Sequence, residues 1–380
     1  HRGPRRTLYQ KAADQLVYKP VGPRDSRLKT FIKAEKINLS LKPDPAPRVI
    51  QPRDPRFNFE FGKYLLPLEH KIYDAIDKLF TRPTIMSKYN SLQQACVIND
   101  HFTRFPDCAV IGLDASRFDQ HVSVPALQFE HSVYNELFNS PELRKLLRMQ
   151  LKNRGVARGN DGWFKYEKKG SRMSGDMNTS LGNKLLMCFM AKAYIDHVGV
   201  DIGFVNNGDD CLLFVSRKYL SKLDGLEEYF RDFGFNIVRE KAVFEMEHIE
   251  FCQCKPVKVN GVWRMIRSIK TSLVKDVTAV SLGHDITQYR RWLFDVAGCG
   301  LAFGRDLPVM GSFYRMLERF GVDGGTYQGK NALFNSMRVL SKGVDVKFSQ
   351  PDDYGRYSFW LQTGLTPQGQ LELEQYFDLA

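Results

Sequence analysis

Cysteines are too few, and apolar runs too short, for several common classes of protein. The seven cysteines are scattered through 380 residues, so a disulfide scaffold is excluded and reduced thiols are expected. Cys252 and Cys254 form the one close pair, and no second pair or histidine cluster completes four zinc ligands. The best apolar candidate, LLMCFMAKAYI (185–195), contains Lys192 and is shorter than the roughly 20 residues that cross a bilayer.

The sequence also lacks internal repeats, low-complexity segments and an N-terminal signal. It begins HRGPRRTLYQ, with neither an initiator Met nor the apolar segment of a signal peptide, so we expect it to be part of a longer product. A length of 380 residues with 43% apolar side chains suffices for one large composite domain, or for two or three small ones.

Positive charge, by contrast, is abundant and unevenly distributed. The net charge is +12, and residues 1–63 hold 15 Lys and Arg against 6 Asp and Glu. Clustered cations favour a polyanionic partner, because binding to phosphates releases condensed counterions. A solvated basic arm is the alternative that charge alone leaves open.

Apolar periodicity predicts a mixture of helices and short strands. The proline-rich segment 42–57 is expected to be extended and irregular. We predict helices over 64–80, 91–102, 125–150, 179–198 and 218–233. We predict strands over 108–113, 211–215, 235–238, 249–253 and 263–268, and a basic hairpin and loop over 152–175. Beyond about residue 270 the pattern is mainly helical, which indicates a separate lobe.

Acidic residues follow two of the predicted strands. Asn207-Gly208 favours a tight hairpin turn, with Asp209 and Asp210 at its tip, and Asp114 follows strand 108–113. If the strands are neighbours, the three carboxylates converge and need a cation. Such hard oxygen ligands suit Mg²⁺, and two-metal sites clamp the attacking and leaving oxygens of a phosphoryl transfer. The preference of Asp for turns explains either motif singly, but explains the pair poorly.

Two segments that contain these acids, and a third that lies between them in the sequence, have a characteristic spacing. They are GLDASRFDQHV (112–122), SGDMNTSLGN (174–183) and VNNGDDC (205–211). They resemble motifs A, B and C of viral RNA-dependent RNA polymerases, and are most similar to those of plant positive-strand viruses of the tombusvirus type, including carmoviruses and umbraviruses. The resemblance extends over about residues 30–255.

The resemblance implies a metal site and a ribose site. Asp114 and Asp209 would be the principal ligands of Mg²⁺, or of Mn²⁺, with Asp210 assisting. Asp119 and Asn183 would recognise the ribose 2′-OH, which distinguishes RNA precursors from DNA precursors. Helix capping or surface polarity is the ordinary alternative for these two side chains.

The resemblance also implies contacts around the nucleotide. In the Ser174-Gly175 pair, the glycine would let the backbone approach the template and nascent pair closely, and Thr179 would brace the sugar-binding side chains. Upstream, TFIKAEKI (30–37) and PRVIQP (47–52) resemble motif F. There Lys33 and Arg48 would bind the triphosphate, and Glu35 would orient the arginine.

Further residues are implied in RNA binding and proton transfer. Lys36, Arg53 and Arg56 would contact RNA, although a solvated basic face accounts equally for each. In GFNIVREKAVF (234–244), which resembles motif D, Lys241 would protonate the departing pyrophosphate, and an ordinary surface lysine is the alternative. FCQC (251–254) resembles motif E, in which Cys252 would grip the growing strand, although relatives carry a basic residue there.

The fold implied is α/β (α+β), a right-hand polymerase whose palm is a small antiparallel sheet flanked by helices. We expect fingers at 1–63, 81–105 and 151–178, palm at 64–80, 106–150 and 179–262, and thumb at 263–380. Residues 340–380 are either thumb or a flexible tail. The implied partners are template and product RNA, NTPs, another viral replicase protein and host membranes, at membrane-associated replication complexes in the host cytoplasm.

Two rival functions remain open at this point. A reverse transcriptase also uses palm carboxylates, and a catalytically silent RNA-binding module would explain the basic N-terminal part.

GGTYQGKN (324–331) approaches a P-loop, but Asn331 replaces the magnesium-binding hydroxyl and a helix is predicted where a strand is required. We therefore discount a P-loop ATPase.

Overall fold

A four-stranded antiparallel sheet carries the acidic segments. In this computed structural model, which describes residues 4–36, 45–280, 285–324, 337, 338 and 340–380, the sheet has the order β6 (Gly203–Asn207), β7 (Asp210–Ser216), β3 (Cys108–Ala115) and β8 (Ile237–Arg239). Side chains alternate between its faces, as strand geometry requires. Ile111 and Leu213 pack in one apolar cluster, and Val110 and Phe214 pack in another.

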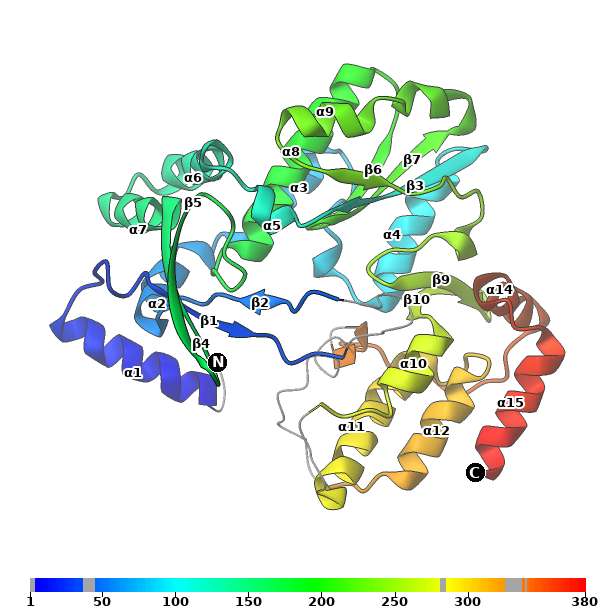
Figure 1. Cartoon of the computed structure of the whole chain (residues 1–380). Coiled ribbons are helices and arrows are strands. Elements are labelled where there is room, and N and C mark those ends of the chain that lie inside the picture. The colour runs from blue at the N-terminus through cyan, green and yellow to red at the C-terminus, as the bar shows by residue number, and fades with distance from the viewer. Residues whose placement is uncertain (1–3, 37–44, 281–284, 325–336, 339) are drawn as a thin grey trace.

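Helices cover both faces of this central sheet (Figure 1). The cluster on one face includes α3 (Glu69–Leu79), α8 (Thr179–Val198) and α9 (Leu226–Asp232). The cluster on the other face includes α4 (Ser91–Thr103) and η3 (Met246–His248). Because both faces are buried, the strands are almost wholly apolar, which makes 108–113 recognisable in the sequence.

A second sheet lies beside the first and is joined to helices of the N-terminal half. Its order is β2 (Val49–Ile50), β1 (Leu28–Ile32), β4 (Lys152–Gly159) and β5 (Gly162–Lys169). β1 runs parallel to β4, whereas β4 and β5 form an antiparallel hairpin. The nearby helices in Figure 1 are α1 (Pro4–Tyr18), α2 (Pro55–Leu65), α6 (Val124–Phe138) and α7 (Pro141–Leu151).

The C-terminal part is a helical lobe built on a two-stranded sheet. Its elements are β9 (Cys254–Val259), β10 (Val262–Arg267), α10 (Ile269–Lys275), α11 (Ile286–Gly304), α12 (Met310–Phe320), α14 (Asp353–Thr363) and α15 (Pro367–Leu379). The Ser358 hydroxyl of α14 accepts a hydrogen bond from the Lys258 amide of β9 and donates one to Glu247. The described part of 340–380 thus packs on the lobe, and the flexible-tail alternative is wrong.

Several predicted elements are confirmed, and others are divided. The long helix 179–198 is present at those bounds, and 152–169 forms the predicted hairpin. Helix 125–150 is divided at Asn139, whose left-handed φ of 42° ends α6 before Pro141 begins α7. Segment 218–233 consists of η2 (Arg217–Leu223) and α9, which are separated by Gly225.

Two expectations about local structure are wrong. α2 begins at Pro55, inside the segment expected to be irregular, because Asp54 caps the helix and proline suits its first turn. The segment 249–253 is not a strand, since Cys252 and Gln253 have positive φ and turn the chain into β9.

Among the described residues, every helix is too short or too polar to cross a bilayer.

Candidate active site

The strand register brings the two acidic motifs together. Asp114 of β3 is the cross-strand partner of Asp210 of β7. Asp209 immediately precedes β7, in the turn after β6, and its side chain is exposed. The prediction that these strands are neighbours is confirmed, so the three acidic residues lie at one end of adjacent strands.

A buried asparagine fixes the turn that presents Asp209. Asn207 pairs with Asp210, so the two central turn residues are Gly208 and Asp209; the turn lies one residue later than Asn207-Gly208. Gly208 has φ +93°, which a glycine adopts without steric cost. The Asn206 side chain accepts a hydrogen bond from the Gly208 amide at 3.0 Å and donates one to its carbonyl at 2.7 Å.

The electrostatics of this strand end disfavour an additional negative charge. Burial, followed by repulsion from Asp209 and from Asp114 and Glu240, raises the pKa of Asp210 to about 6 from its ordinary 3.8. A hydrogen bond with the Cys252 thiol acts in the opposite direction. Burial and the neighbouring acids therefore raise the cost of ionising Asp210, which a bound cation would relieve.

Cys252 lies against the acidic turn. The Asn207 amide donates to its Sγ at 3.2 Å, and burial followed by repulsion from Asp210 raises the pKa of the thiol. The thiol is therefore protonated near neutral pH. From this position Cys252 supports the acidic turn through its contact with Asn207. A contact of Cys252 with RNA stays a prediction.

Asp119 and Asn183 meet beside the acids. Asn183 Nδ2 donates to Asp119 Oδ1 at 2.7 Å. Burial raises the pKa of Asp119, the Asn183 hydrogen bond lowers it, and Asp209 adds repulsion. Asn183 lies in the second turn of α8, whose N-cap residue is Asn178, so helix capping does not account for Asn183.

The two predicted phosphate ligands share one carboxylate. Glu35 lies 3.2 Å from Lys33 Nζ and 3.5 Å from Arg48 Nη1. Backbone pairing between β1 and β2 sets this spacing, and the Lys33 amide donates to the Arg48 carbonyl at 2.8 Å. The Arg48 side chain is 71% exposed, so its guanidinium is accessible to an anion. The expected contact of Glu35 with the arginine is present.

Contacts with residues 51 and 52, and hydrogen bonds within the loop itself, hold the 174–179 loop. Gly175 has φ +118°, and a Cβ there would lie 3.2 Å from the Pro52 backbone, so close approach to residue 52 already requires glycine. The Gln51 amide donates to the Ser174 carbonyl at 2.6 Å. The Thr179 hydroxyl donates to the Met173 and Asp176 carbonyls, and thus braces this loop instead of the Asp119–Asn183 pair.

Three residues expected to contact RNA are engaged elsewhere. Arg53 is 3% exposed and its Nε donates to Asp176 at 2.6 Å, so the expectation of direct RNA contact is corrected to a structural role. The Arg56 side chain pairs with Asp25 and is 12% exposed. The Lys36 ammonium donates to a carbonyl of α10 and lies 5.3 Å from the centre of the Trp292 ring, and burial lowers its pKa to about 8.

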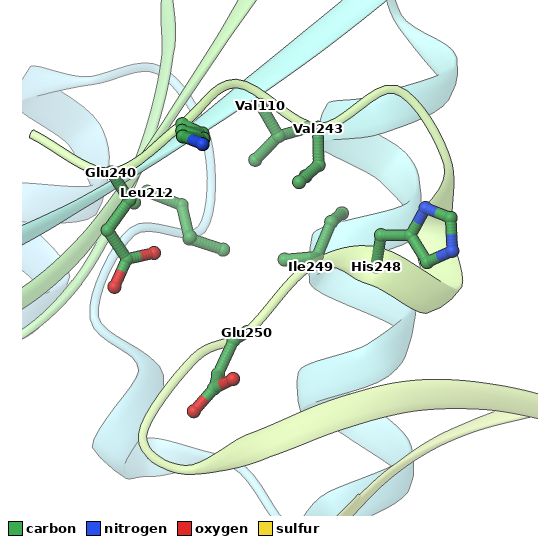
Figure 2. A pocket seen from close by; sticks show the side chains of 9 residues that line it. Val110, Leu212, Glu240, Val243, His248, Ile249 and Glu250 are labelled. Carbon is green, nitrogen blue, oxygen red and sulfur yellow. The ribbon is translucent and has the colours of Figure 1, made fainter. Parts of the chain in front are cut away.

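A pocket of about 260 Å³ lies on the face of the sheet that carries Val110 and Leu212, and none of the three aspartates lines it. Lys241 is one of its lining residues and is exposed. Figure 2 shows Glu240 and Glu250 toward one end of the pocket and His248 at the other. Lys241 lies in the segment after β8, between Arg239, which pairs with Leu113, and Val243, which bridges to Val110. It is therefore further along β3 than Asp114, away from the acidic end, and its role as a proton donor stays a prediction.

The donor set fits a divalent cation by its chemistry. Carboxylate oxygens are the ligands that Mg²⁺ and Mn²⁺ prefer, and burial, followed by repulsion from the neighbouring acids, raises the pKa of Asp210. Within the described residues, no group of three or more His, Cys, Asp or Glu side chains is already closed around one point. The candidate ligands are Asp114, Asp209 and Asp210, which the strand register places at one end of β3 and β7.

The sequence interpretation missed the polar residues behind these motifs. Arg172 and Glu130 form an ion pair with both side chains 0% exposed, and Arg172 also contacts Asn183. Glu130 lies 42 residues from Arg172 along the chain, so local spacing gave no signal of the pair. The same holds for Asp176, the buried partner of Arg53.

The chain belongs to a known family. The model of the family described as viral RNA dependent RNA polymerase matches residues 1–380, so the chain is a member of that family. The relatives it resembles are RNA-directed RNA polymerases of plant viruses, which confirms the resemblance seen in the motifs.

Three relatives illustrate the extent of the similarity. The polymerase of maize chlorotic mottle virus is 44% identical over 99% of this chain and 39% of its own length. That of turnip crinkle virus is 43% identical over 100% of this chain and 49% of its own length. That of tobacco necrosis virus (strain A) is 42% identical, with 99% and 52% covered. The chain therefore spans about half or less of these relatives.

Proposed function

We propose that this chain catalyses RNA-templated nucleotidyl transfer from NTPs, as an RNA-directed RNA polymerase that replicates a positive-strand viral genome. The observation that carries the proposal is the pairing of Asp114 with Asp210, next to the turn that holds Asp209. Family membership supports it independently. In the reaction, the RNA 3′-OH attacks the α-phosphorus of the NTP and pyrophosphate leaves.

The three acids are the proposed holders of Mg²⁺ or Mn²⁺. When bound, such ions neutralise charge and orient the reacting oxygens. The chain supplies the geometry: the Asn206-clamped turn fixes Asp209, and the strand register fixes Asp114 and Asp210. Catalysis then depends mainly on positioning and charge stabilisation.

Other residues of the site are proposed to bind the nucleotide. Lys33 and Arg48, held by Glu35, would take the triphosphate, since an exposed guanidinium grips phosphate oxygens in pairs. Asp119 and Asn183 would bind the ribose 2′-OH. Lys241 would give a proton to pyrophosphate.

RNA is the proposed macromolecular partner. The β4–β5 hairpin supports this, because Trp163 and Phe164 are 63% and 62% exposed next to Lys165. Exposed aromatic rings among cations are typical of surfaces on which single-stranded bases stack. The net charge of +12 adds long-range attraction to phosphate.

The proposed layout follows the right-hand scheme. The sheet containing β3 and β7 would be the palm, the sheet containing β1 and β4 with its helices the fingers, and the lobe from β10 to α15 the thumb. Work on host cytoplasmic membranes, together with another replicase protein, is proposed for the longer product to which such a chain would belong.

One extension assay tests the function. The purified chain is incubated with an RNA template, four NTPs and Mg²⁺, alongside Asp209→Ala and Asp114→Ala, with Asp232→Ala as the matched exposed-acid control. We expect template-length RNA from the wild type and from the control, and none from the two site variants, which retain RNA binding. Full elongation by either site variant refutes the proposed site.

The same assay separates the rival functions. A reverse transcriptase would incorporate dNTPs in preference to NTPs on the RNA template. A catalytically silent RNA-binding module would show salt-dependent RNA affinity and no product.

A further inference from the structure

A buried ion pair lies directly behind the Asp119–Asn183 contact. Arg172 pairs with Glu130, both side chains are 0% exposed, and the Arg172 Nε–H donates to Asn183 Oδ1 at 3.0 Å. Asn183 Nδ2 in turn donates to Asp119 Oδ1 at 2.7 Å. A continuous chain of contacts therefore runs from α6 through the loop before α8 to the short helix α5 (Phe118–His121).

The ion pair itself is held from several sides. Asn178 Nδ2 and the Tyr134 hydroxyl donate to Glu130 Oε1 at 2.6 and 2.8 Å. The Arg172 backbone amide donates to the Asp119 carbonyl at 2.8 Å. The guanidinium is thus fixed relative to both Glu130 and the α5 turn.

This arrangement decides which way the Asn183 amide faces. A guanidinium carries donors only, so Arg172 requires Oδ1 of Asn183 on its side. The opposite orientation would set Nδ2 against a donor and Oδ1 against the Asp119 carboxylate. With the amide locked, its NH₂ group faces Asp119 and has a second N–H to offer.

A locked amide beside a carboxylate matches a hydroxyl group. An acceptor on Asp119 and a donor on Asn183 lie side by side, and a ribose 2′-OH can donate to the first and accept from the second. A 2′-hydrogen can do neither. Sites that hydrogen-bond a substrate hydroxyl reject the analogue without it more strongly than apolar pockets can.

We infer that Arg172 and Glu130 are positioning residues for sugar selection, and that they act through the orientation of Asn183. The inference rests on the proposed function and deepens it. A contribution to folding stability explains the presence of the Arg172–Glu130 pair poorly, because a buried ion pair can often be replaced by apolar side chains of similar volume at no net cost in stability.

Gly182 gives an independent way to disturb the pair. A Cβ at residue 182 would lie 2.3 Å from Glu130 Oε1 and 2.4 Å from an Arg172 Nη. Gly182→Ala therefore displaces the ion pair while every polar side chain of the network is retained. The substitution also favours α8, since alanine is the better helix former.

The experiment compares kcat/KM for NTP and for the matching dNTP in single-nucleotide incorporation on an RNA template. The variants are Arg172→Lys and Gly182→Ala, and the control is Arg264→Lys, whose buried partner Asp306 lies in the C-terminal lobe. In both test variants we expect kcat/KM for NTP to fall about tenfold or more, and the value for dNTP to change less than about twofold. The control keeps the wild-type ratio.

The outcomes are distinguishable. Equal losses for NTP and dNTP in Arg172→Lys and Gly182→Ala would mean a purely structural pair and would overturn the inference while the polymerase function stands. A wild type that incorporates no NTP would instead refute the proposed function, and the inference with it. If Arg172→Lys fails to fold, as circular dichroism would reveal, the ratio measured for Gly182→Ala decides alone.

Discussion

The acidic strand end should cost folding stability when no cation is bound, and Asp210→Asn measures that cost. Burial and the neighbouring charges of Asp209, Asp114 and Glu240 raise the pKa of Asp210 from 3.8 to about 6. At 1.36 kcal/mol per pKa unit, this corresponds to about 3 kcal/mol. The side chain is partly exposed, and solvent screening reduces the expected effect to about 1–2 kcal/mol.

The direction of the pH dependence follows from the raised pKa. Well above pH 6 the folded wild type carries an ionised Asp210 and the full cost, which falls as the pH drops through 6 and vanishes below about pH 4, where the carboxyl is protonated in the unfolded state as well. The asparagine variant has no such titration. Its free energy of unfolding should exceed that of the wild type by about 1–2 kcal/mol at pH 7.5, and should match it below about pH 4.

Urea unfolding followed by tryptophan fluorescence, in EDTA and over a pH series, measures the difference. Asp232→Asn, an exposed acid of α9, is the matched control and should show no such trend. Addition of Mg²⁺ at pH 7.5 should stabilise the wild type more than Asp210→Asn and narrow the gap. A variant no more stable than the wild type at pH 7.5, or a gap that grows as the pH falls, would refute the reasoning.

Three further predictions concern RNA binding, stability and proton transfer. Trp163→Ala with Phe164→Ala should weaken single-stranded RNA binding about thirtyfold or more in a filter assay, given roughly 1–3 kcal/mol for each of two stacked bases; Trp360→Ala, another exposed aromatic, should not. Arg53→Ala should lower the free energy of unfolding by about 3–5 kcal/mol, because Asp176 is left buried and unpaired; unchanged stability with lost RNA affinity would restore a direct RNA contact. Lys241→Ala should slow single-nucleotide incorporation about 10²-fold at unchanged RNA affinity, and an unchanged rate would mark an ordinary surface lysine.

The strand and helix that carry the acids were predictable because their signals are local. The apolar run before Asp114 and the periodic segment 179–198 each depend on residues close in sequence, and both elements are present. Boundaries were less predictable where one backbone angle decides, as at Asn139 and Gly225, whose positive φ values separate elements that periodicity alone would join.

At the site, the wrong expectations arose mainly where a charged residue has an ion-pair partner that is distant in the sequence. A basic residue near a basic motif suggests RNA, yet Arg53 is neutralised by Asp176, 123 residues away. Arg172 escaped notice for the same reason, since Glu130 lies 42 residues before it. Pairings at such separations arise only when the fold is formed, whereas Asp114 and Asp210 were recoverable because family motifs already connect them.

The hydrogen bonds between the Asn206 side chain and Gly208 have a consequence for the register of the strands. Apolar side chains cover both faces of the central sheet, so a slip by one residue would still bury hydrophobic groups and the core alone penalises it weakly. Yet the slip would turn one carboxylate of the opposing pair toward the helices. The correct register of β7 against β3 thus depends on the Asn206 side chain, which fixes the turn between β6 and β7. A one-residue slip at this turn would leave the core buried and separate the opposed carboxylates of Asp114 and Asp210.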